Sequence, residues 1–170
     1  MVMTINSAIR QLTATQEDYL EIIFRLNQDG KTTVTVTDLA KRLGCQLPTV
    51  TRTIKALTQH GYVIHRPRES IQLSDQGLAI AQQVTHRHDD TEAFLHTVLC
   101  LDAETATADA CKIEHGLSPL AAQRLHAFIK CFLDLPLDVQ THIQTSVQSI
   151  DKHAQLFNRI QSHRQSPWRH

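Results

Sequence analysis

Closely spaced helix starts and stops in the first half of the chain constrain its fold more than any other feature. Thr35, with Asp38 three residues later, is typical of a capping box, and Gly44 ends the short apolar stripe that follows. Pro48 suits the first turn of a second helix, which ends at Gly61. These signals predict two short helices joined by a tight turn.

A helix before this pair and a hairpin after it complete the pattern. The earlier helix is indicated by apolar residues at the spacing of one helical face, namely Tyr19, Ile22, Ile23 and Leu26. Residues 62–66 and 71–73 are β-leaning runs on either side of a basic turn. Three helices and a small hairpin predict a winged helix-turn-helix over residues 11–80, after a tail at 1–10.

The rest of the chain predicts a second, all-helical domain over residues 81–160, with a flexible tail at 161–170. Ser74 can cap a long connecting helix that runs to about residue 100. Further helices are expected near Ala108, after Ser118 and from about Asp138. The predicted fold class is therefore mainly α, with an N-terminal winged helix-turn-helix and its small β-hairpin wing followed by an all-helical domain.

Charge is distributed unevenly along the chain, although 17 basic and 17 acidic residues cancel overall. Between Asp38 and Glu69 there is no acidic residue, and the basic ones are Lys41, Arg42, Arg52, Lys55, Arg66 and Arg68. This cationic stretch coincides with the predicted recognition helix and wing, which favours DNA binding over the alternative of a protein-interaction module. The candidate contacts are Gln46, Pro48, Thr49, Thr51, Arg52 and Lys55 on the helix, with Arg66 and Arg68 on the wing.

Side chains that commonly bind metal ions share faces on three predicted helices. They are Asp18 with Glu21, His88 with Glu92, and Cys111 with Glu114 and His115. Four carboxylates in one cluster would repel one another, and a divalent cation would relieve that repulsion. The alternative is that these residues are separate and solvated, which periodicity by itself does not reject.

Several short stretches resemble the diphtheria-toxin-repressor family of metal-dependent regulators, which includes the manganese transport regulators. They are residues 15–21 (TQEDYLE), 47–54 (LPTVTRTI), 73–77 (LSDQG), 87–88 (RH) and 110–118 (ACKIEHGLS). The resemblance runs from about Leu12 to Leu135. It implies a homodimeric repressor that binds a palindromic operator when its metal sites are filled, and that controls genes of metal uptake and homeostasis.

The resemblance also implies a ligand set, in which this chain combines features of two branches of the family. The manganese-branch ligands fall on Asp18, Glu21, His88, Glu114 and His115, whereas Cys111 matches the iron branch. Glu92 is a further candidate, but the iron branch has a histidine where this chain has Thr107. The expected ion is Mn(II) or Fe(II), while Co(II), Ni(II) or Zn(II) can bind in vitro.

The sequence predicts a cytoplasmic regulator that is not an enzyme. No apolar run approaches the roughly 18 residues of a membrane-spanning helix, and the N-terminus does not read as a secretory signal. Two rivals stay open: a winged-helix regulator that senses a small organic ligand, and a metal-dependent hydrolase that uses Glu114 as a general base.

Overall fold

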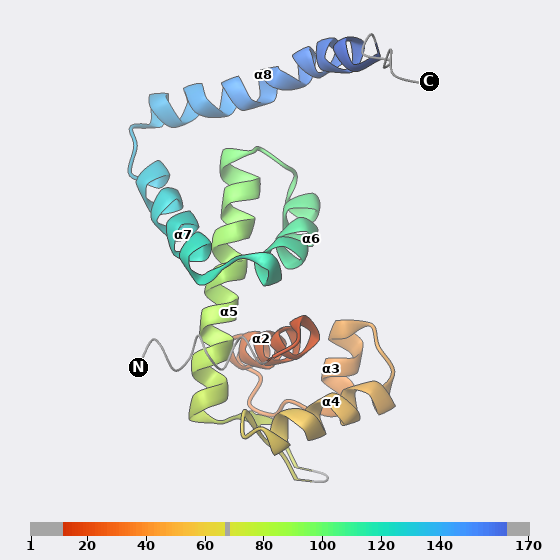
Figure 1. Ribbon diagram of the computed structural model, residues 1–170. Coiled ribbons are helices and arrows are strands. Elements are labelled where there is room, and N and C mark those ends of the chain that lie inside the picture. Colours follow the sequence, from red (N-terminus) through yellow and green to blue (C-terminus); the bar gives the residue numbers. More distant parts are fainter. Residues whose placement is uncertain (1–11, 67–68, 163–170) are drawn as a thin grey trace. The chain divides into compact units, whose positions relative to one another are not determined.

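The computed structural model describes residues 12–66 and 69–162, with side chains up to residue 149 (Figure 1). The chain forms two compact units that divide between Arg87 and His88. Helices make up most of both, and the first unit contains a small antiparallel sheet. The predicted fold class is confirmed.

The first unit contains the predicted winged helix-turn-helix. Its elements in chain order are α2 (Ala14–Gln28), α3 (Val36–Leu43), α4 (Leu47–Gln59), β1 (Val63–Ile64) and β2 (Gln72–Leu73). The two strands pair Val63 with Leu73, and an isolated bridge joins Val34 to Ile71. The hairpin is therefore held to the loop that precedes α3.

Local capping explains where α3 begins and ends. The Thr35 side chain accepts a hydrogen bond from the Asp38 backbone N–H, and the Asp38 carboxylate accepts one from the Thr35 backbone. Gly44 ends the helix at a φ of 62°, in the left-handed region. Hydrogen bonds from Lys31 and then Thr35 hold the pKa of Asp38 at about 2, below its ordinary 3.8.

One apolar core joins the elements of the first unit. Its fully buried members include Leu20, Ile23, Leu39, Ile54, Leu57 and Ile80, which lie on α2, α3, α4 and the start of α5 (Asp75–Ala93). Gly77 is required where α5 meets the wing, because a Cβ there would lie 1.9 Å from the Tyr62 carbonyl oxygen. An ion pair between Glu17 and Arg87, both largely buried, joins α2 to α5.

The second unit is helical. The long helix α5 (Asp75–Ala93) enters it and ends in a π-helical turn, η1 (Phe94–Val98). The elements that follow are α6 (Ala103–Ile113), the 3-10 turn η2 (Glu114–Gly116), α7 (Pro119–Leu133) and α8 (Leu137–Ser162). Helix α6 begins about five residues before its predicted start, because Asp102 caps it through the Thr105 backbone N–H.

Two small apolar clusters hold the helices of the second unit together. Leu95 packs with Ala106 and Ala110, which fixes α6 against the end of the long helix. Val98 packs with Ile129 and Phe132 of α7. The cluster around Leu95 includes Ala110, the residue directly before Cys111, so this packing positions the Cys111 side chain.

Some predictions fall outside the part of the chain that the structure describes. They are the N-terminal tail at 1–10, residues 163–170 of the C-terminal tail, and Arg68 on the wing. Within the described residues, no helix is both long and apolar enough to cross a membrane.

Candidate metal centre and nucleic-acid interface

Helix α4 has one buried face and one exposed face. Val50, Ile54 and Leu57 are buried in the core of the first unit. The predicted DNA contacts on the other face are exposed, namely Gln46, Pro48, Thr49, Thr51, Arg52 and Lys55. Gln46 precedes the helix without forming a side-chain cap, so its amide is not used to hold the helix start. This face can present polar and basic groups to a partner.

The wing adds a further basic residue. Arg66 follows β1 and is exposed, with a nitrogen 4.0 Å from a Glu69 carboxylate oxygen. An exposed pair at that distance is weak, so the guanidinium can exchange Glu69 for a phosphate at little cost. The exposed arginines of α4 and the wing therefore give the first unit a cationic surface.

Three ligand-type side chains come together within the second unit. The His88 Nδ1 atom lies 3.2 Å from Glu114 Oε2 and 3.8 Å from Cys111 Sγ. One potential ligand atom from each of the three lies within 4.8 Å of the others. An imidazole, a thiolate and a carboxylate at this spacing can bind one divalent cation.

The Glu114 carboxylate has the environment that a cation site requires. The side chain is 0% exposed, and neither of its oxygens has a hydrogen-bond partner among the described residues. His88 Nδ1 lies 3.2 Å from Glu114 Oε2, and His115 Nε2 lies 3.5 Å from Glu114 Oε1. A buried carboxylate without hydrogen bonds is costly, so these residues fit a bound cation.

The backbone that presents these ligands differs from the α-helical expectation. Cys111 lies in the last turn of α6, whereas Glu114 and His115 lie in the 3-10 turn η2. Cys111 and Glu114 still supply ligand atoms to one cluster, so the change of helix type does not separate them. The tighter turn nevertheless leaves Glu114 close to both His88 and His115.

The other two predicted ligands belong to the first unit. Asp18 is half-buried on α2, and Glu21 is buried on the same helix. Arg25 Nε donates to Glu21 Oε1 over 2.8 Å, so this carboxylate already has a cationic partner.

Sequence reasoning did not identify the ion pair between Glu17 and Arg87. These residues precede Asp18 and His88 directly, so the pair holds α2 to α5 beside two proposed ligands. They are 70 positions apart, and no local pattern links them. The only available signal was a pair of charges on helix faces that are otherwise apolar.

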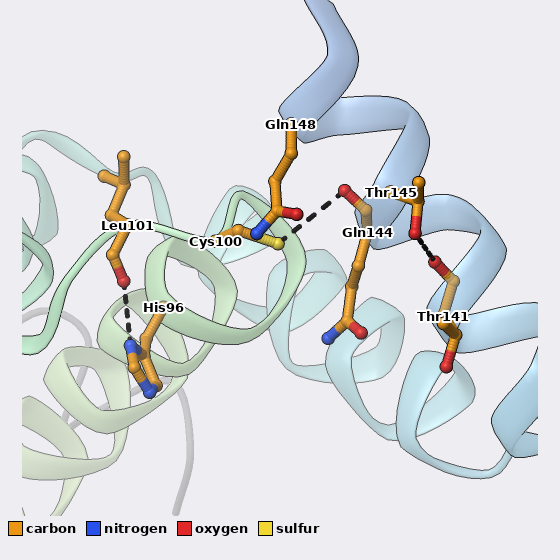
Figure 2. A pocket seen from close by; sticks show the side chains of 7 residues that line it. All are labelled: His96, Cys100, Leu101, Thr141, Gln144, Thr145 and Gln148. Atoms are coloured by element: carbon orange, nitrogen blue, oxygen red, sulfur yellow. Dashed lines mark hydrogen bonds between the residues drawn. The ribbon is translucent and has the colours of Figure 1, made fainter.

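A separate pocket in the second unit offers no comparable ligand set. Figure 2 shows that it is lined by His96, Cys100, Leu101, Thr141, Gln144, Thr145 and Gln148. His96 Nδ1 lies 2.9 Å from the Leu101 carbonyl oxygen, and Cys100 Sγ lies 3.9 Å from the Gln144 carbonyl oxygen. The lining contains no carboxylate, so the pocket is poorly suited to a hard cation.

A winged helix-turn-helix with an exposed basic recognition helix, followed by a helical unit that carries a thiolate–imidazole–carboxylate cluster, defines a metal-responsive transcriptional regulator. The family comparison agrees. The chain belongs to the iron-dependent repressor family: residues 11–71 match its N-terminal DNA binding domain, and residues 74–136 match its metal binding and dimerisation domain. The resemblance seen in the sequence is thereby confirmed. This family consists of transcriptional repressors, so the expectation that the chain is not an enzyme is confirmed as well.

Two individual relatives are also named as a transcriptional regulator or a repressor. The chain is 36% identical over 118 residues to an uncharacterised HTH-type transcriptional regulator of Methanocaldococcus jannaschii, covering 69% of this chain and 94% of the relative. It is 30% identical over 122 residues to the diphtheria toxin repressor of Corynebacterium diphtheriae, covering 72% of this chain and 54% of that protein.

A solved structure shares the fold. It is a manganese-dependent transcriptional repressor in complex with manganese, 27% identical, with a TM-score of 0.63. The match covers 68% of this chain and 52% of that structure. The chain thus spans about half the length of these last two relatives.

Proposed function

We propose that this protein is a cytoplasmic repressor that binds a palindromic operator as a homodimer when Mn(II) or Fe(II) is bound, and that it controls genes of metal uptake and homeostasis. The observation that carries the proposal is the buried Glu114 carboxylate, which has no hydrogen bond to any described residue and lies beside His88 and Cys111. A family domain for metal binding and dimerisation covers these residues.

The proposed ligands come from both units. His88, Cys111, Glu114 and His115 would hold the ion from the second unit, and Asp18 with Glu21 would complete the shell from α2. When bound, a divalent cation supplies positive charge that offsets the carboxylates. Ligands drawn from both units would couple metal binding to the placement of the DNA-binding unit.

The identity of the ion follows from the donor set and from supply in the cell. Oxygen ligands from Asp18, Glu21 and Glu114 suit Mn(II) and Fe(II), whereas the Cys111 thiolate favours softer ions. The Irving–Williams order lets Co(II), Ni(II) or Zn(II) compete in vitro, so availability decides. The solved relative named as manganese-dependent and the iron-dependent family name support these two ions.

The proposed DNA interface is the exposed face of α4 together with the wing. Thr49, Thr51 and Arg52, with Gln46 just before the helix, would reach base edges or phosphates, while Pro48 and Lys55 flank them. Arg66 and Arg68 would contact the backbone from the wing. Two recognition helices of a dimer would enter successive major grooves about 34 Å apart.

Operator titration with and without metal tests the proposal. The purified protein is titrated against DNA from its own promoter, anaerobically, with chelator, Mn(II) or Fe(II). Coupling of this kind commonly amounts to about 5- to 150-fold, and DNA must tighten metal binding by the same factor. Equal operator affinity with chelator and with metal would refute the metalloregulator and favour a regulator that senses another ligand.

A further inference from the structure

Glu92 lies on the side of the His88 ring opposite the metal cluster. Its Oε2 atom is 3.6 Å from His88 Nε2, whereas Nδ1 of the same ring faces Glu114 and Cys111. The two ring nitrogens are therefore in different surroundings. One faces the residues that can bind an ion, and the other faces a carboxylate.

Glu92 does not belong to the cluster itself. Among the described residues, the groups of ligand atoms that lie within 4.8 Å of one another do not include it. The sequence offers Glu92 as a further ligand, but that role in the iron branch requires a histidine where this chain has Thr107. The contacts of Glu92 thus suit a different role.

Thr107 holds the Glu92 carboxylate in place. Its Oγ1 donates to Glu92 Oε1 across the space between α6 and α5. The same hydroxyl lies 2.8 Å from the Ala103 carbonyl oxygen, and its single proton serves one acceptor at a time. The charged carboxylate is the stronger acceptor, so the contact to Glu92 is favoured.

We propose that Thr107 and Glu92 are positioning residues for His88. The Glu92 carboxylate beside Nε2 would hold the ring in the orientation in which Nδ1 faces Cys111 and Glu114. Carboxylate partners of this kind fix the tautomer and orientation of metal-binding histidines. This inference rests on the proposed metal-responsive function.

Metal titration of the full-length protein separates positioning from ligation. Mn(II) and Co(II) are titrated against a competing chelator with the wild type, Glu92→Gln, Thr107→Val and Thr107→Ser. We expect an unchanged number of ions per protomer in all four, with affinity lowered about tenfold in Glu92→Gln and Thr107→Val. Thr107→Ser keeps the hydroxyl and should restore the wild-type affinity. Glu104→Gln, an exposed change on α6, is the matched control.

A spectroscopic signal reports on the metal site rather than on stability. The thiolate-to-cobalt absorption band should persist in Glu92→Gln, because Cys111 is retained.

The outcomes distinguish this inference from the proposed function. Loss of one whole ion per protomer in Glu92→Gln would make Glu92 a ligand and overturn the inference. Unchanged affinity in both Glu92→Gln and Thr107→Val would also overturn it and leave the proposed function intact. A wild-type protein that binds neither Mn(II) nor Co(II) would refute the proposed function itself.

Discussion

Replacement of Glu114 by glutamine should stabilise the metal-free protein while it removes the response to metal. Glu114 is 0% exposed, and neither carboxylate oxygen has a hydrogen-bond partner in the described part of the chain. Folding must therefore desolvate a charge with little compensation beyond His88, 3.2 Å away, and His115, 3.5 Å away. Glutamine keeps the shape, removes the charge, and can donate its amide N–H to His88 Nδ1.

The size of the effect follows from the cost of an unsatisfied buried polar group. That cost is about 1–3 kcal/mol, and more for a charged group, so metal-free Glu114→Gln should gain at least about 1 kcal/mol. In a chain of 170 residues, each kcal/mol moves the melting temperature by about 2–4 °C. Metal at 1,000 times its dissociation constant stabilises the wild type by about 4.1 kcal/mol. The order of stability should therefore reverse when metal is added.

Urea unfolding followed by circular dichroism measures the free energy of unfolding with and without metal. The wild type, Glu114→Gln and the exposed control Glu104→Gln are unfolded with chelator and then with saturating Mn(II) under anaerobic conditions. The control should stay within about 0.5 kcal/mol of the wild type in both conditions. The reasoning is refuted if metal-free Glu114→Gln is no more stable than the wild type, or if metal stabilises both equally.

Three further changes test other parts of the protein. Cys111→Glu should shift the metal response toward Mn(II), because it replaces a thiolate with an oxygen ligand; unchanged selectivity in competitive titrations would remove the thiolate from the shell. Arg52→Ala should weaken operator binding by about 1–3 kcal/mol without changing metal affinity in the absence of DNA, whereas the exposed Arg124→Ala should leave both titrations unchanged. Asp38→Asn should make the free energy of unfolding depend less on pH between about pH 4 and pH 2. Hydrogen bonds lower the pKa of Asp38 to about 2, so its contribution to stability is complete above about pH 4 and disappears as the pH falls toward 2. Solvent screening of this exposed pair with Lys31 limits that contribution to about 1 kcal/mol, and an identical pH profile in the variant would contradict the assignment.

Local signals predicted the elements of the first unit well. The capping box at Thr35, the left-handed Gly44 and the proline in the first turn of α4 all act within a few residues of the chain. The same holds for Ser118, which caps α7 through the Ala121 backbone N–H. Such features depend little on tertiary packing, so the sequence alone is sufficient to place them.

Features that depend on packing were predicted less well. The start of α6 was placed late, because its first turns contain alanine and threonine and lack a clear apolar stripe. The π-helical turn at the end of α5 and the 3-10 turn at Glu114 have no local sequence signal here. Proximity of His88 to Cys111, 23 residues apart, was one of two alternatives that periodicity left open, and the family resemblance favoured it.

The two buried carboxylates of the proposed centre differ in how their charge is compensated before metal binds. Glu21 accepts a hydrogen bond from Arg25 at 2.8 Å, whereas Glu114 has no hydrogen bond in the described structure. An ion that binds Glu21 must compete with an existing cation, but at Glu114 it compensates a charge that is otherwise unsatisfied. The free energy of metal binding should therefore depend more on Glu114 than on Glu21. Glu114→Gln should weaken Mn(II) binding by the larger factor in chelator competition, and the reverse order would show that the desolvated carboxylate does not drive binding.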